Sequence, residues 1–254
     1  APGVLLLDAS EVTKRFGGLV ANNNMALTVK AGEVMALIGP NGAGKSTMFN
    51  LISGVLPLTS GDVVFRGESI GGSKPFAIAR RGIGRTFQHV KLIPQMSVLD
   101  NVALGAYLRG EADVLRAAFR LDREEEGRTK AEAARAIERV GLAAQMHDAA
   151  GSLPLGKQRV VEIARALAAD PLLLLLDEPA AGLRHLEKQA LADVLRQLKS
   201  EGMSLLLVEH DMDFVMNLTD RIVVMEFGTK LMEGTPAEVQ ASPAVRAAYL
   251  GTEH

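Results

Sequence analysis

The sequence predicts an α/β fold with a mainly parallel sheet, and three observations support this prediction. Strand-like apolar segments alternate with helix-like segments along most of the chain. Residues 172–176 are all leucine, and a continuous apolar run of this kind is typical of a strand buried on both faces. Residues 33–52 combine an apolar strand, a glycine-rich loop and a helix, which is a recurrent unit of parallel sheets.

The first part of the chain departs from this alternation, because strand-like segments follow one another. Two short strands are predicted at residues 4–13 and 24–30, joined by residues 14–18, with a turn at residues 22–24. We expect these opening strands to form an antiparallel layer. The helix after the glycine-rich loop is expected to close at Gly54. The elements that follow are a strand at 61–67, a helix at 74–81 and a strand at 83–87 that ends on Gln88.

A helical insertion is predicted at about 91–154. Ser97 is a suitable N-cap for a helix over 98–108, and residues 111–140 are helix-like with a break expected near Gly127. The pairs Glu124/Arg128 and Glu126/Lys130 are four residues apart with the acid first, which indicates a solvated, charged helix face.

The alternation of strands and helices returns after the insertion. The predicted helices are 156–169, 186–199, one from Asp211, and short ones after Pro236 and Pro243; the strands are 172–176, 204–208, 221–226 and 229–233. We therefore predict one domain over 1–254. Its nucleotide-binding core covers about 1–90 and 155–235, its helical subdomain about 91–154, and a helical tail about 236–254.

Composition excludes some classes of protein. The chain has no cysteine, so disulfides and thiolate metal sites are impossible. A net charge of −2 gives no reason to expect nucleic acid as a partner. The longest apolar run, 172–176, is far shorter than the ~20 residues of a membrane-spanning helix. Any membrane part of the system is therefore expected in other chains or domains.

The glycine-rich loop carries the strongest chemical signal. Residues 39–47 match G-x-x-x-x-G-K-[ST] in full, between a strand and a helix as this motif requires. Such a loop turns its N–H groups towards phosphate oxygens, and the helix N-terminus adds positive charge. Lys45 is expected to reach the β- and γ-phosphates, and the Ser46 hydroxyl to ligate Mg²⁺. The residues expected to contact a nucleoside triphosphate are Gly39, Pro40, Asn41, Gly42, Ala43, Gly44, Lys45, Ser46 and Thr47.

Polar side chains also follow the other predicted strands. Asp177 and Glu178 end the leucine strand, where Asp177 can hold Mg²⁺ and Glu178 can deprotonate an attacking water. His210 ends the strand 204–208, although a lone histidine is more often structural than catalytic. Gln88 follows another strand, and its amide could bind Mg²⁺ or water and report the nucleotide state. Spacing alone favours Phe16 as a packing residue.

Taken together, these motifs resemble the ATP-binding cassette (ABC) ATPases over almost the whole chain. The order is an aromatic residue, the loop 39–47, Gln88, a helical insertion, residues 153–159, the acidic pair and His210. The resemblance implies a P-loop NTPase fold, with ATP and Mg²⁺ as ligands. It implies that Phe16 stacks on adenine, that Glu178 is the base and that His210 contacts the γ-phosphate. Gln88, Glu178 and His210, with Lys45, would then be the catalytic set, and Ser46, Gln88 and Asp177 the metal ligands.

Further motifs resemble the ATPases of branched-chain amino-acid importers. They are residues 14–19, 84–88, 162–167, 178–183 and the tail from 233 to 251. The resemblance implies a peripheral subunit on the cytoplasmic face of a bacterial-type inner membrane. Its partners would be permease subunits contacted through the Gln88 and helical region, a second ATPase and, indirectly, an extracytoplasmic solute-binding protein. Transporters of urea, short amides, lipopolysaccharide or lipid share much of this pattern and stay open.

One segment departs from the family. ABC ATPases carry an L-S-G-G-Q-like motif that binds the γ-phosphate held by the opposite subunit. Here Pro154 replaces Ser, Leu155 replaces the first Gly and Lys157 replaces Gln, while Arg184 stands where Asp or Asn is usual. Proline offers neither a hydroxyl nor an N–H group. We therefore expect a heterodimer with one good and one weaker ATP site, the good site combining this chain's P-loop with the partner's motif.

Two other functions remain possible from the sequence. A soluble ABC ATPase acting on DNA or ribosomes would usually carry long coiled coils or two tandem cassettes, and the chain shows neither. A nucleotide-gated regulator with little catalysis is suggested by the altered segment at Pro154. The presence of Glu178 and His210 argues against that second alternative.

Overall fold

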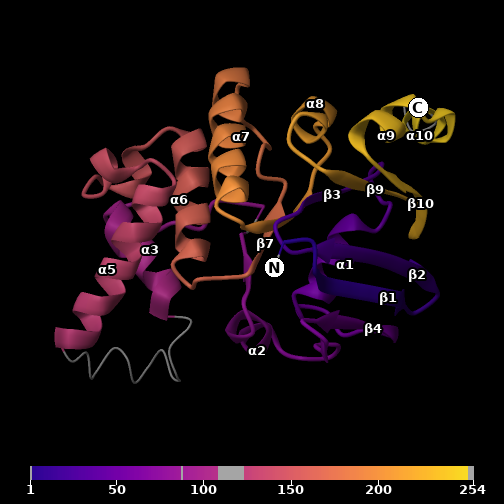
Figure 1. Ribbon diagram of the computed structural model, residues 1–254, viewed down its shortest axis with the longest axis horizontal. Helices are drawn as coiled ribbons and strands as arrows, with labels where there is room; N and C mark the ends of the chain where they lie inside the picture. Colours follow the sequence, from indigo (N-terminus) through magenta and orange to yellow (C-terminus); the bar gives the residue numbers. More distant parts are fainter. Residues whose placement is uncertain (1, 87, 108–122, 251–254) are drawn as a thin grey trace.

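The computed structural model describes residues 2–86, 88–107 and 123–250, and these form two sheets with helices packed against them (Figure 1). The larger sheet has six strands in the order β10-β9-β3-β8-β7-β6. Its members are β3 (Val34–Ile38), β6 (Ile83–Arg85), β7 (Leu173–Asp177), β8 (Ser204–Val208), β9 (Arg221–Glu226) and β10 (Thr229–Gly234). All neighbouring pairs are parallel except β9 and β10. This confirms the predicted α/β class with a mainly parallel sheet.

The smaller sheet is the predicted antiparallel layer. Its order is β2-β1-β4-β5, with β1 (Leu5–Phe16), β2 (Leu19–Lys30), β4 (Ser60–Phe65) and β5 (Glu68–Ser69). The turn predicted at 22–24 is wrong, because these residues lie within β2 and the hairpin turns after Phe16. Glu11 and Asn24 have left-handed φ values of 51° and 48° and coincide with breaks in the register. Such bulges let both strands continue past residues that favour turns.

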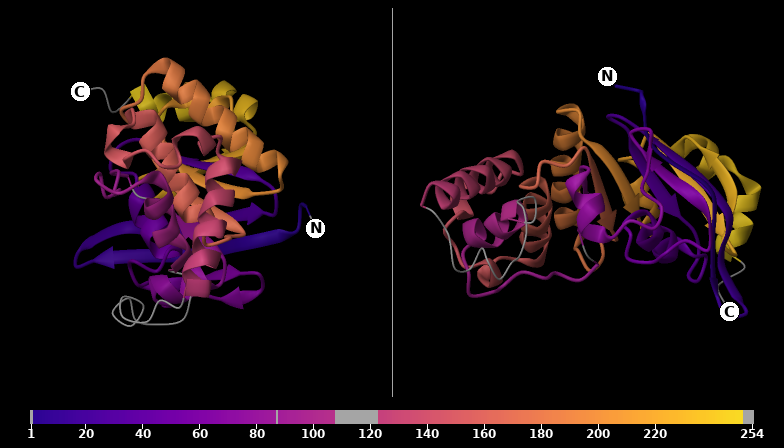
Figure 2. Two further views of the ribbon diagram at one scale, coloured as in Figure 1. Left: turned by 90° about the vertical axis from the view of Figure 1, so that its left-hand side faces the viewer. Right: turned by 90° about the horizontal axis from the view of Figure 1, so that it is seen from below.

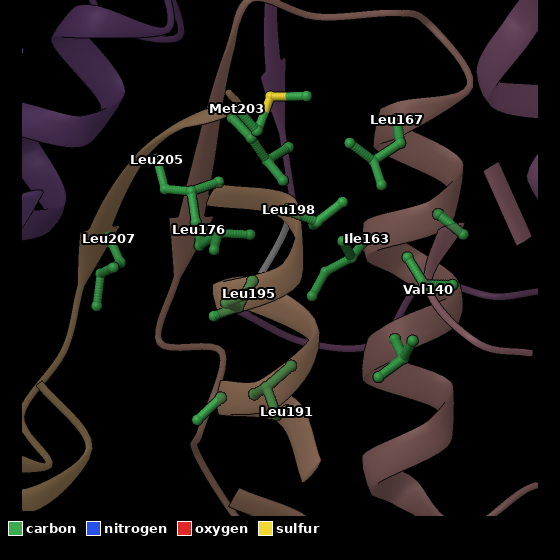
Figure 3. Close-up of a cluster of buried hydrophobic side chains, with 14 of the residues drawn as sticks. Val140, Ile163, Leu167, Leu176, Leu191, Leu195, Leu198, Met203, Leu205 and Leu207 are labelled. Carbon is green, nitrogen blue, oxygen red and sulfur yellow. The ribbon is translucent and has the colours of Figure 1, made fainter. Parts of the chain in front are cut away.

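Two hydrophobic cores lie on opposite faces of the six-stranded sheet. In β7, Leu174 and Leu176 lie in the core that contains most of the helices. Leu173 and Leu175 lie in the other core, with α1 (Lys45–Ile52) and the smaller sheet. This division follows the two-residue period of a strand, and burial on both faces explains the unbroken leucine run. Figure 3 shows the helix-side core, where leucines of β7 and β8 meet α6 (Leu155–Leu167) and α7 (His185–Ser200).

A helical group stands to one side of the sheets (Figure 2). It contains α3 (Val98–Tyr107), α5 (Arg123–Arg139) and the short η1 (Ala143–Gln145) and η2 (Ala150–Ser152), and it packs against α6. Ser97 accepts a hydrogen bond from the Asp100 N–H at 3.0 Å, as expected of an N-cap. The break expected near Gly127 is wrong. Helix α5 continues through this exposed glycine, and a Cβ at this position would meet no neighbouring atom within 4 Å.

The other predictions for this region differ in outcome. Lys130 donates to Glu126 at 2.8 Å, so that predicted pair forms. The side chain of Glu124 and the expected helix over 111–122 lie outside the described residues.

Gly105 brings α3 close to α6, because a Cβ there would stand 1.9 Å from the Arg165 carbonyl oxygen.

Several short helices lie between or after the strands. They are α2 (Pro75–Arg80), α8 (Met212–Met216), α9 (Pro236–Ala241) and α10 (Pro243–Leu250). Thr235 and Glu238 form a reciprocal capping box at the start of α9, which explains why that helix begins after Thr235. Within the described ranges, no helix is both long and apolar enough to cross a bilayer.

Candidate nucleotide-binding and hydrolytic site

The glycine-rich loop connects β3 to α1 and is fixed against two neighbouring strands. A Cβ on Gly39 would stand 2.3 Å from the Met225 carbonyl oxygen, and one on Gly44 would stand 2.4 Å from that of Ala21. Gly44 also has a φ of 97° and is the N-cap of α1. Glycine is therefore required at both positions by close packing and by backbone conformation. The helix has no acidic residue in its first turn and no side-chain cap, so its N–H groups are available to an anion.

Lys45 points into this loop. Its ammonium group donates to the carbonyl oxygens of Gly39 and Pro40 at 2.6 and 3.0 Å, and the residue is 7% exposed. Burial lowers the pKa of Lys45, and the negative charge of Glu178 partly opposes that shift. The buried ammonium group therefore has neutral carbonyls as partners and one carboxylate nearby. A phosphate would add negative charge beside it and stabilise its charged form.

A cavity of about 470 Å³ opens over the loop. Its walls combine the loop with residues of the β1–β2 hairpin, the end of β7 and the β9–β10 turn: Phe16, Leu19, Val20, Ala21, 41–47, Glu178, Phe227 and Gly228. Phe16 is 44% exposed, and Lys14 lies over its ring at 5.0 Å from the centroid. A buried core role for Phe16 is therefore wrong, because its exposed ring stands at the cavity wall.

Three of the sequence-predicted residues meet at the ends of neighbouring strands. Glu178 follows β7, Gln88 follows β6 and His210 follows β8. The Gln88 amide donates to Glu178 Oε2 at 3.1 Å, and His210 Nδ1 lies 3.7 Å from the same oxygen. Glu178 has a left-handed φ of 46°, held by its N–H bond to the Val208 carbonyl at 2.9 Å. Residues that their surroundings hold in a rarely populated backbone conformation are common at functional sites.

Asp177 has a partner that sequence reasoning missed. Arg85 donates to its carboxylate at 3.1 Å, donates to Ser53 Oγ at 2.6 Å, and stacks over the Phe49 ring at 5.1 Å. Burial raises the pKa of Asp177, and the Arg85 charge opposes that rise. Nothing in the sequence pairs these residues, because they are 92 positions apart. Strand order brings them together, since β6 and β7 are parallel neighbours.

The altered segment 153–157 forms the N-terminus of α6. Pro154 is the N-cap, and the Gly156 N–H group donates to Glu187 Oε1 at 3.2 Å. The other oxygen of Glu187 accepts from the Arg184 N–H at 2.9 Å, so one carboxylate caps both α6 and α7. These two N–H groups, Arg184 first, lower the pKa of Glu187. The motif pattern alone leaves Gly156 as an available donor, whereas in the structure its N–H is already engaged.

Two buried charges on α6, Arg159 and Glu162, and the half-buried Arg165 hold the segment that follows Gln88. Arg159 donates to the Gln88 carbonyl at 2.6 Å, Glu162 accepts from the Lys91 N–H at 2.7 Å, and Arg165 donates to the Lys91 carbonyl at 2.8 Å. Burial is the main cause that raises the pKa of Glu162 and lowers that of Arg165. The three-residue spacing places these charges on one helix face, and that spacing is the signal that could have identified them.

Glu209 links two strand ends in a similar way. It is fully buried, and its carboxylate accepts from the Ala180 N–H at 2.7 Å, the His210 N–H at 3.1 Å and the Asp211 N–H at 3.4 Å. It therefore ties the loop after Glu178 to the backbone of His210. Burial raises its pKa despite the three donors. Sequence reasoning assigned it no role, since it precedes the more conspicuous histidine.

Sequence comparisons agree with this geometry. The model of the family described as "ABC transporter" matches residues 22–181, and that of "Branched-chain amino acid ATP-binding cassette transporter" matches residues 229–254. The chain is similar to the high-affinity branched-chain amino acid transport ATP-binding protein BraF of Pseudomonas aeruginosa, with 40% identity over 97% of this chain and 98% of BraF. It is 39% identical to the corresponding LivG of Escherichia coli K12, with the same coverage.

Solved structures agree as well. The ADP conformation of MJ1267, an ATP-binding cassette of an ABC transporter, aligns with a TM-score of 0.86 and 31% identity over 98% of this chain and 99% of that one. The dimeric cassette MJ0796 aligns with a TM-score of 0.75 and 27% identity over 91% and 99%. The family match covers more than half of the chain and the relatives cover nearly all of it. The chain belongs to the ABC transporter family of ATP-binding cassettes.

Proposed function

We propose that this chain is the ATP-binding and ATP-hydrolysing subunit of a transporter that imports branched-chain amino acids. The observation that carries the proposal is the meeting of Gln88, Glu178 and His210 beside the phosphate-binding loop. A carboxylate, an amide and an imidazole at one point are the groups needed to position and deprotonate a water. The match of residues 229–254 and the relatives named for branched-chain amino acids support the transported solute.

The chemistry divides among the chain's own residues. Residues 39–47 bind the phosphates of ATP, Lys45 neutralises charge at the β- and γ-phosphates, and Phe16 stacks on the base. Glu178 accepts a proton from the attacking water while a bond forms between the water oxygen and the γ-phosphorus. The bond to the β,γ-bridging oxygen breaks, and ADP and inorganic phosphate are released. Gln88 and His210 hold the water and the γ-phosphate in place.

A magnesium ion fits the donor set at this site. Ser46, Gln88 and Asp177 offer hydroxyl, amide and carboxylate oxygens, which are the ligands that Mg²⁺ prefers. The buried Asp177 already faces a cation, Arg85, so its carboxylate is placed to meet positive charge. When bound, Mg²⁺ neutralises charge on the phosphate oxygens.

Partners follow from the same proposal. A second ATPase would face residues 153–157, and membrane permeases would contact the region of Gln88 and the helical subdomain at about 91–154. This arrangement puts the chain on the cytoplasmic face of the membrane, with a solute-binding protein on the other side. The contacts of Arg159, Glu162 and Arg165 with residues 88–91 support transmission of motion between Gln88 and the helices.

Reconstitution tests the proposal. The complete complex in proteoliposomes, supplied with ATP inside and solute-binding protein outside, is expected to accumulate labelled leucine, isoleucine or valine. Urea and short amides serve as competing solutes. The Glu178→Gln complex, which keeps the same shape, is expected to bind ATP without uptake. Uptake of urea instead of leucine would assign the chain to the related systems, and a chain that copurifies with no membrane subunit would favour a non-transport ATPase.

A further inference from the structure

Phe227 is the most exposed large apolar side chain among the described residues. It lies in the turn between β9 and β10, with 85% of its surface exposed and a left-handed φ of 47°. Bulky side chains rarely adopt this backbone conformation, which glycine and asparagine tolerate far better. Neither burial nor local backbone preference accounts for a phenylalanine at this position.

The turn that carries Phe227 is fixed to the nucleotide site. The neighbouring Gly228 donates its N–H to the Ala43 carbonyl at 3.0 Å and accepts from the Asn23 N–H at 2.8 Å. A Cβ on Gly228 would stand 2.6 Å from the Ala21 carbonyl oxygen, so the turn packs closely on β2. Thr229 Oγ1 also donates to the Glu226 carbonyl at 2.9 Å across the turn. The backbone of Phe227 is therefore held at a defined place relative to the phosphate-binding loop.

Phe227 and Phe16 line the same cavity. The polar end of this cavity is the loop 41–47, and its apolar lining includes Phe16, Leu19 and Phe227. The chain has only ten aromatic residues, eight Phe and two Tyr, so two exposed rings at one cavity need an explanation. A nucleoside triphosphate has the matching division, with charged phosphates at one end and a flat, weakly polar base at the other.

We propose that Phe227 is a second aromatic contact for the purine base of the nucleotide whose phosphates the loop 39–47 binds. The inference rests on the proposed function, because it takes ATP as the occupant of the cavity. Base–aromatic stacking would cover apolar surface of the exposed Phe227 ring. The strained turn conformation keeps the ring at the cavity, where it limits how far the base can move.

Binding measurements on the full chain test this contact. Phe227→Asn removes the ring while tolerating the left-handed backbone. We expect its Kd for ATP to rise about fivefold or more, and its Kd for inorganic tripolyphosphate, which has no base, to stay unchanged. Phe76→Ala is the matched control, since Phe76 is 47% exposed on α2 and does not line the cavity. Phe227→Tyr is expected to bind ATP as the natural chain does.

A spectroscopic readout does not depend on loss of affinity. The chain has no tryptophan, so Phe227→Trp introduces a single tryptophan at the turn, which can be excited apart from the two tyrosines. Its emission is expected to change on adding ATP and to stay constant on adding tripolyphosphate. Unchanged emission with saturating ATP, or equal weakening of ATP and tripolyphosphate in Phe227→Asn, would overturn the inference. The inference would also be overturned by a Phe227→Asn variant that binds ATP normally but no longer associates with the membrane subunits. Failure of the proposed function is a separate result: Lys45→Ala would then bind ATP as tightly as the natural chain.

Discussion

The N-termini of α1 and α6 both carry backbone N–H groups that can bind an anion. Those of α1 have no side-chain partner, whereas one of those of α6 already donates to a carboxylate. At α1 the Gly44 cap has no side-chain partner and the first turn has no acid, so the N–H groups and Lys45 face an open cavity. At α6 the cap is Pro154, and the Gly156 N–H already donates to the Glu187 carboxylate. A helix N-terminus attracts anions through its partial positive charge, and a carboxylate placed there cancels that attraction.

This difference distinguishes two surfaces of the chain: the phosphate-binding loop before α1, and residues 153–157 at the start of α6. In the proposed function, the N–H groups of α1 stay available to the chain's own ATP, whereas the Gly156 N–H on the surface proposed to face a partner's ATP already donates to Glu187. The two lysines show the same contrast: Lys45 is buried and directed into the loop, while Lys157 is exposed at the start of α6. The capping of Gly156 therefore supports the expectation of unequal ATP sites that Pro154 first suggested. Substitutions on each surface should separate the two.

The largest effect is expected from Glu178→Gln. Loss of the base should lower ATP turnover by ~10²–10⁴-fold, because general-base catalysis contributes that much. Nucleotide affinity should persist, since the amide keeps the shape and a hydrogen-bond acceptor. Phosphate release and ATP binding measure the two quantities. Glu138→Gln, an exposed change on α5, serves as the control and should leave both at their natural values.

Lys45→Ala and Lys157→Ala form a matched pair that tests the two surfaces directly. Removing Lys45 should weaken ATP binding by this chain by about 10- to 100-fold, the range for a lost hydrogen bond to a charged group. Removing Lys157 should leave that affinity unchanged, because Lys157 lies at the start of α6 and does not line the cavity over the loop. Titration of a fluorescent ATP analogue measures both. Equal losses in the two variants would contradict the division.

Glu187→Gln should have a smaller effect, confined to the partner-facing surface. Removing the carboxylate charge restores the positive end of α6, so the ATP concentration for half-maximal pairing with the second ATPase should fall about two- to fivefold. Light scattering or gel filtration across an ATP series gives this concentration. ATP affinity of the isolated chain is the internal control and should not change. A rise in the half-maximal concentration would show that Glu187 supports pairing.

The smallest effect concerns Glu209, which connects the loop after Glu178 to His210. Burial raises its pKa above the ordinary value of 4.5, so the folded chain holds this proton more tightly than the unfolded chain. Its contribution to stability is therefore full below pH 4.5 and is lost as pH rises through the folded pKa. Glu209→Gln has no such proton. Urea unfolding should show the natural chain losing stability relative to Glu209→Gln as the pH rises above 4.5. A constant difference would contradict this.

Much of the fold was predictable because local patterns and tertiary structure agree. The leucine strand, the strand 204–208 and the loop 39–47 each combine a clear pattern with a matching position in the sheet. Strand ends of a parallel sheet gather at one edge, so the meeting of Gln88, Glu178 and His210 followed from their positions. Their roles stay predictions until the variants are measured.

The rest depends on contacts that no local pattern records. Asn22–Asn24 favour a turn by composition, yet pairing with β1 keeps them in a strand. Gly127 lowers helix propensity, but one exposed glycine does not end a helix that packs on its neighbours. Arg85, Glu187 and Glu209 resemble ordinary surface charges in sequence. Their partners are 92, 31 and 29 residues away, and only the folded chain brings each pair together.

ATP turnover with and without the second ATPase tests the central claim most directly. The isolated chain should hydrolyse ATP slowly, and adding the second ATPase should raise the rate by more than about tenfold, because that subunit completes the site over residues 39–47. Glu178→Gln in this chain should abolish most of the gain. Rapid turnover by the isolated chain, unaffected by Pro154→Ser or by the second ATPase, would contradict the account.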